Sequence, residues 1–160
     1  MSRVSRTGLW ILVGMLFPLH FVLHIGFGLG RSAPDLLTIA LLLAAREVGL
    51  RGASVVGLLF GVVEDSLTVL AFGANSVTMT VIGVLGAFTR DLFVGDSKLF
   101  MLSYFFAGKW MRDFLHWMIM GQELRQPFVD QVLAQGLLAA LYAALVGMGL
   151  VIIMGLVRGR

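Results

Sequence analysis

Five charged side chains lie inside long apolar segments of this 160-residue chain instead of between them. An ionisable group within a lipid bilayer is costly unless it is paired or hydrated, so such groups usually mark functional sites. A carboxylate there can carry a proton, act as a catalytic acid, or accept hydrogen bonds from a partner helix; the alternative is an internal polar network. The five residues are Glu64, Asp65, Lys109, Arg112 and Asp113.

Three of these charges belong to a longer polar stripe. Lys109, Arg112, Asp113 and His116 occupy positions i, i+3, i+4 and i+7, which share one face of a helix. Lys109 can pair with Asp113 at this spacing, and Arg112 can neighbour His116. Because such a face is unfavourable toward lipid, we expect it to face the bundle interior, a water-filled cavity or a partner.

A second pattern consists of small residues. Ala53, Gly57, Gly61 and Asp65 recur every four residues and form a smooth groove that ends in a carboxylate. Small residues at this spacing let membrane helices approach closely, and Gly57 and Gly61 form a GxxxG motif. The groove is expected either to pack within its own bundle or to receive the membrane helix of another protein.

Histidines offer the strongest hint of a metal site. His20 and His24 lie four residues apart on one helix face, and His116 is the third histidine of the chain. Two imidazoles at that spacing can bind zinc, but Phe21 stands where the HExxH motif requires glutamate. The chain has no cysteine, which excludes disulfides, Cys-ligated zinc and a thiol nucleophile. We therefore expect no metal or other cofactor.

The composition indicates an integral membrane protein. Hydrophobic residues make up 59% of the chain and charged residues 13%, about half the charged share of a soluble domain. The 12 basic residues are dispersed between apolar runs. A nucleic-acid-binding surface needs them gathered into a patch, so no nucleic-acid partner is expected.

The apolar runs predict a single all-α membrane domain over residues 1–160, built as a compact bundle of about six transmembrane helices. A helical span needs about 20 residues. Proline and aspartate at 34–35 suit the first turn of a helix, and the glycine and asparagine within 72–75 suit a turn. The predicted spans are 8–29, 34–50, 52–72, 75–93, 98–120 and 128–157.

The distribution of basic residues predicts the orientation of this bundle. Lys and Arg concentrate in cytoplasmic loops, so the side with more of them is assigned to the cytoplasm. Six spans place only Arg31 and Arg125 on one side, which puts both termini in the cytoplasm. The other side collects Arg3, Arg6, Arg46, Arg51, Arg90, Lys98, Arg158 and Arg160.

Several of these elements together resemble the MreD family of rod shape-determining membrane proteins. The resemblance rests on Pro34-Asp35-Leu36-Leu37 at the start of an apolar helix, then Gly57, Gly61 and Asp65 at four-residue intervals, then a glycine-centred turn at Gly73. It covers roughly residues 30–95. The chain departs from the family pattern by placing Glu64 beside Asp65 and by its turn sequence at 72–75.

The resemblance implies a non-enzymatic scaffold in the bacterial inner membrane, within the machinery that elongates the cell wall and controls cell shape. Its direct partner would be an MreC-like single-span protein, and through it MreB, RodA and a class B penicillin-binding protein. Either the Ala53, Gly57 and Gly61 face or the stripe from Lys109 to His116 would receive the partner helix. The sequence leaves both open.

Two other functions compete with the scaffold. MreD-like proteins resemble the substrate-binding subunits of energy-coupling-factor transporters, so Glu64, Asp65, Lys109 and Arg112 could instead line a vitamin-type binding cavity. The alanines that mark coupling in those subunits are absent from the first span. An intramembrane aspartic enzyme is less expected, because Glu64 and Asp65 are adjacent on one helix and their side chains diverge by about 100°.

Overall fold

The computed structural model describes residues 6–26, 33–68, 71–92 and 97–154, and every regular element within these ranges is helical. The all-α prediction is therefore confirmed for the described chain. The outer ends of the predicted spans 8–29 and 128–157 lie outside it, as do Arg3, Arg31, Arg158 and Arg160. The elements are α1 (Arg6–Phe21), η1 (Val22–Gly26), α2 (Leu36–Ser66), α3 (Ala74–Leu92), α4 (Lys98–Ile119), η3 (Gln122–Leu124), η4 (Val129–Gln135) and α5 (Gly136–Ile153).

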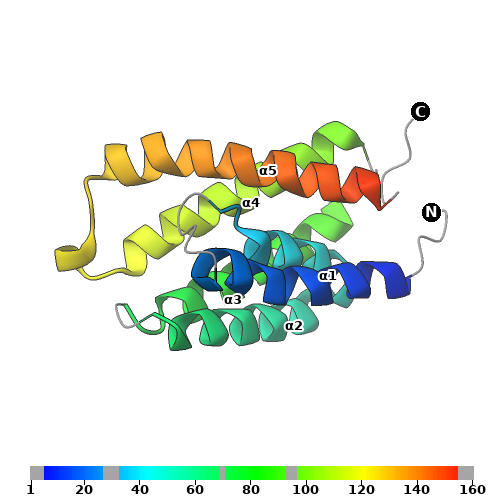
Figure 1. Cartoon of the computed structure of the whole chain (residues 1–160), viewed down its shortest axis with the longest axis horizontal. Helices are drawn as coiled ribbons and strands as arrows, with labels where there is room; N and C mark the ends of the chain where they lie inside the picture. The colour runs from blue at the N-terminus through cyan, green and yellow to red at the C-terminus, as the bar shows by residue number, and fades with distance from the viewer. Residues whose placement is uncertain (1–5, 27–32, 69–70, 93–96, 155–160) are drawn as a thin grey trace.

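Helix α2 folds back on itself at Gly49, whose backbone has a φ of 69° and a ψ of −179°. A positive φ is readily adopted only by glycine. A straight helix of 31 residues would be about 46 Å long. Yet Asp35, just before α2, and Glu64, near its end, both bind the side chain of Arg112. The two halves of α2 therefore form a hairpin, visible in Figure 1 as the cyan and teal segments.

This hairpin corresponds to the predicted spans 34–50 and 52–72, which the sequence placed in two separate helices. The backbone is non-helical at Gly49, so α2 comprises two helical segments, one for each of these predicted spans, although it carries a single label among the five α-helices of the described residues. The predicted turn at 72–75 is present as a turn before α3, with φ of 90° at Gly73. Six transmembrane passes stay a prediction.

The small-residue groove on α2 is filled by α3 of the same chain. A Cβ built on Gly57 would lie 2.3 Å from the carbonyl oxygen of Met79, and one built on Gly61 would lie 2.4 Å from the Cα of Ser76. These are backbone atoms, which cannot move aside without displacing the helix. Of the two alternatives for the groove, the structure thus shows packing within the bundle.

Among the described residues, large apolar side chains are exposed and several charged ones are buried. Leu138 is 70% exposed, whereas Lys109 and Arg112 are 7% and 8% exposed. Two segments, Thr7–Gly26 and Val129–Ile153, are long and apolar enough to cross a membrane. The start of α1 and the end of α5 lie at the same end of the bundle (Figure 1).

We predict that Gly57→Ala destabilises the protein, because its methyl group would overlap the backbone of α3. Overpacking of this kind costs about 1–3 kcal/mol or more. The measurement is thermal unfolding in detergent, with Gly14→Ala as the matched control. A Cβ on Gly14 meets nothing within 4 Å, so this variant should unfold at or above the wild-type temperature. Equal unfolding temperatures for the two variants would contradict the packing described.

Candidate functional site

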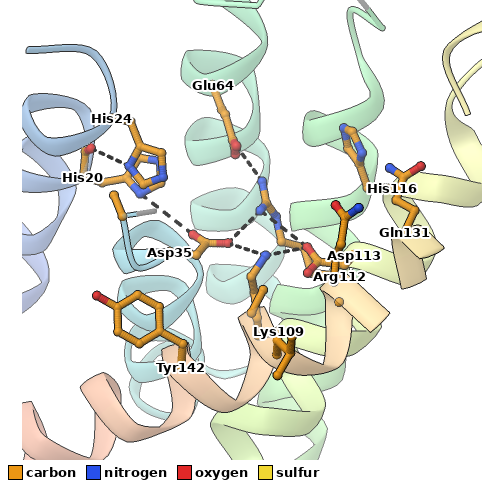
Figure 2. Close-up of a pocket in the computed structure, with 15 residues that line it drawn as sticks. His20, His24, Asp35, Glu64, Lys109, Arg112, Asp113, His116, Gln131 and Tyr142 are labelled. Carbon is orange, nitrogen blue, oxygen red and sulfur yellow. Dashed lines mark hydrogen bonds and ion pairs between the residues drawn. The ribbon is translucent and has the colours of Figure 1, made fainter. Parts of the chain in front are cut away.

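Arg112 on α4 lies at the centre of a buried ion network. Its Nη1 donates to Asp35 Oδ2 at 2.6 Å, and its Nη2 donates to Glu64 Oε1 at 2.5 Å and to Asn75 Oδ1 at 3.2 Å. The guanidinium therefore joins α4 to both halves of α2 and to the first turn of α3, as Figure 2 shows for the two carboxylates. A planar group with five donors suits this multiple bridging.

Lys109, one turn before Arg112, supplies the second buried cation. Its Nζ lies 2.5 Å from Asp113 Oδ1 and 3.2 Å from Asp35 Oδ2. The predicted i, i+4 pair between Lys109 and Asp113 is confirmed, and so is the expectation that the stripe faces the interior or a cavity. Arg112 lies 3.9 Å from Asp113 on its own helix but binds Asp35 and Glu64, which lie outside α4, at 2.6 and 2.5 Å.

Asp35 holds both cations and also starts α2. Its Oδ1 accepts from the Thr38 backbone amide at 3.0 Å, and its Oδ2 accepts from the Thr38 hydroxyl at 2.7 Å. The carboxylate thus satisfies an amide that has no partner within the helix, as the sequence indicated. Its role in the ion network was not predicted.

Asp65 points away from this network and fixes the connection between α2 and α3. Its carboxylate accepts the backbone amides of Asn75 and Ser76 at 3.1 and 2.9 Å, and the Ser76 hydroxyl at 2.5 Å. The side chain is fully buried. Adjacent positions on one helix thus give Glu64 and Asp65 different surroundings, so they do not form an acid pair.

The two histidines of the first helix differ in the contacts of their Nδ1 atoms. His20 Nδ1 accepts the backbone amide of Leu37 at 3.3 Å, so that nitrogen carries no proton. His24 Nδ1 lies 2.9 Å from the carbonyl oxygen of His20, which can only accept, so that nitrogen carries the proton. In the neutral form of the His24 ring, Nε2 is then the acceptor. The two rings stack with their centroids 4.0 Å apart.

The network forms one wall of a cavity of about 740 Å³. Both histidines of the first helix, the three carboxylates, the two cations and His116 line its polar side (Figure 2). The segment from Gln131 to Tyr142 supplies the facing wall. A cavity of roughly 300–1,000 Å³ is typical of small-ligand sites.

Two π-helical segments border the cavity. His24 lies in η1, and Gln131 and Gln135 lie in η4; all three residues line the cavity. The wider π-helical turn is rare and frequently occurs at functional sites. The helical geometry is therefore irregular at the cavity, in η1 directly after α1 and in η4 directly before α5, whereas α1 and α5 themselves are α-helical.

The formal charges of the described residues that line the cavity do not balance. Asp35, Glu64 and Asp113 contribute three negative charges, and Lys109 and Arg112 contribute two positive charges, which leaves −1 when the histidines are neutral. Among the described residues, two buried side-chain atoms have no hydrogen-bond partner. They are Glu64 Oε2 and Arg112 Nε.

The predicted site residues thus separate into three groups. Glu64 and the stripe from Lys109 to His116 meet at the cavity; Ala53, Gly57 and Gly61 pack on α3; Asp65 anchors the α2–α3 connection. Nowhere in the described chain do three or more His, Asp or Glu side chains gather to hold a metal ion. Asp35, Asn75 and Tyr142 were missed as site residues.

Comparison with protein family models, curated proteins and solved structures finds no match for this chain.

We predict that Arg112→Met destabilises the protein strongly, because Glu64 would lose its cation and Asp35 would keep only Lys109. Breaking a buried ion pair by removing one partner costs about 3–5 kcal/mol. Denaturant unfolding in detergent measures the loss, with Arg51→Met as control because Arg51 is exposed. The double variant Arg112→Met with Glu64→Leu should recover part of it. Wild-type stability for Arg112→Met would contradict the central role of this residue.

Proposed function

We propose that this chain is a non-enzymatic, multi-pass membrane scaffold of the MreD type, which supports lateral cell-wall synthesis by binding an MreC-like single-span partner. The observation that carries the proposal is that the residues behind the resemblance act together in one structural unit. Asp35 caps the start of α2, and Gly57 and Gly61 allow α3 to pack closely against α2. Asp65 binds the first turn of α3, and Gly73 lies in the turn between α2 and α3.

The exposure of large apolar side chains and the burial of Lys109 and Arg112 support the same proposal. A scaffold within a bilayer needs apolar outer faces for lipid and partner helices, with its polar groups paired inside. On this proposal the protein lies in the bacterial inner membrane with both termini in the cytoplasm. Its connection to MreB, RodA and a class B penicillin-binding protein would be indirect, through the MreC-like partner.

The partner helix needs a face that the bundle leaves open. The groove at Ala53, Gly57 and Gly61 is filled by α3, and the stripe from Lys109 to His116 faces the cavity. An apolar groove of about 360 Å³ remains between α1 and α2, lined by aromatic and aliphatic side chains around Gly14. We assign the partner helix to this groove because no atom lies within 4 Å of a Cβ built on Gly14, so another backbone can approach closely there.

A second candidate is the substrate-binding component of a small-molecule transporter. The 740 Å³ cavity favours this reading specifically, since a scaffold does not need one. Restored uptake of a vitamin in a transport-deficient host would establish it. An enzymatic role has less support, because Asp35 and Glu64 each bind a separate nitrogen of Arg112 and do not share a proton with one another.

We predict that Gly14→Leu abolishes copurification with the MreC-like partner while the protein still folds, because the Cβ enters open space and the rest of the side chain occupies the open groove. The measurement is pull-down from membranes after co-expression. Gly149→Leu on α5 is the matched control, since a Cβ there also meets nothing within 4 Å, and it should retain the partner. Retention by Gly14→Leu would rule out this groove, and failure of wild-type protein to bind would refute the scaffold.

A further inference from the structure

We propose that the charged cavity binds an organic ammonium group attached to an apolar body, supplied either by a lipid headgroup such as ethanolamine or by a small free amine. This inference rests on the cavity alone and does not depend on the scaffold proposal. Three features of the cavity support it: the charges that are already paired, the hydrogen-bond acceptors without a partner, and the apolar wall formed by α5.

The paired charges argue against an anionic ligand. Both terminal nitrogens of Arg112 donate to carboxylates or to Asn75, and Lys109 lies against Asp35 and Asp113. An anion would have to displace a carboxylate from one of these cations. The unpartnered Nε of Arg112 offers one N–H, which a water or a neutral oxygen can satisfy.

The remaining acceptors favour a cation that donates hydrogen bonds. Glu64 Oε2 is buried and has no partner among the described residues. His24 lines the cavity, and in the neutral form of its ring Nε2 is the acceptor, because Nδ1 donates to the carbonyl oxygen of His20. The described residues that line the cavity carry a net formal charge of −1 when the histidines are neutral, so one ammonium group would neutralise it. An ammonium group also carries up to three hydrogen-bond donors.

The opposite wall fits the apolar body of such a ligand. Leu138, Ala139 and Tyr142 on α5 line the cavity. An aromatic ring at this position can attract a cation. No Cα atoms of α1 and α5 lie within 8 Å of one another, so these helices do not pack closely across the cavity. Leu138 and Tyr142 are 70% and 45% exposed, which gives the cavity an apolar margin on the outer surface of the bundle.

The experiment is native mass spectrometry of the full chain with four probes. Phosphatidylethanolamine is compared with its N-acetylated form, which keeps the phosphate and acyl chains but lacks the ammonium, and benzylamine is compared with benzyl alcohol. We expect each amine to bind in preference to the counterpart that lacks the ammonium group. Binding of phosphatidylethanolamine identifies the lipid as the source, and binding of benzylamine alone identifies a free amine. Equal binding within both pairs, or no binding of either amine, would overturn the proposal.

Two variants connect the binding to the cavity. Tyr142→Leu should weaken amine binding at least about threefold through loss of the ring, whereas Tyr142→Phe should retain it. Glu64→Gln should weaken it about tenfold or more by removing the unpaired carboxylate oxygen and the charge. If Glu64→Gln does not fold, the tyrosine pair decides the question. Unchanged binding in Tyr142→Leu would overturn the assignment of the ligand to this cavity.

Discussion

The rest of the structure depends on one interaction: Arg112 binds Asp35 through one terminal nitrogen and Glu64 through the other. A guanidinium buried among apolar helices is stable only when carboxylates of correct geometry surround it. Those carboxylates lie at opposite ends of a long helix, so they can meet at one side chain only if that helix reverses direction. Gly49 makes the reversal possible, and the hairpin then determines which face of each half meets α3 and α4.

The polar cluster and the small-residue groove are therefore two parts of one arrangement. Gly57 and Gly61 bring α3 close enough for Asp65 to bind its first amides, and this places Asn75 beside Arg112. Lys109 and Arg112 are buried in the interior, and many large apolar side chains are exposed on the outer surface. This division of roles is why we locate the partner on an outer face and the ligand in the cavity.

Much of this architecture could be predicted from the sequence, because helix boundaries follow local signals. Pro34 and Asp35, the turn at Gly73 and the four-residue spacing of Lys109 and Asp113 each act over a few residues, and each is found where it was expected. The long-range partners of Arg112 could not be assigned, because no local pattern links residues 77 and 48 positions apart.

A partial signal for these partners was nevertheless present. A six-span topology puts residue 35, residue 64 and the end of the fifth span near the same membrane surface, where two cations within a helix require carboxylates. Combining topology with charge balance would have brought Asp35 into the site. The π-helical segments at η1 and η4 have no comparable sequence signal, since their residues also suit an α-helix.

The central claim is that α2 reverses within a membrane-embedded bundle whose charged cluster lies toward the outer surface. Cysteine accessibility in intact cells tests it most directly, because the chain has no cysteine of its own. We expect a membrane-impermeant thiol reagent to label Ser66→Cys and Gln122→Cys from outside, and to label Arg51→Cys only after the membrane is permeabilised; all three positions are exposed. Labelling of positions 51 and 66 from the same side of the membrane would contradict the account.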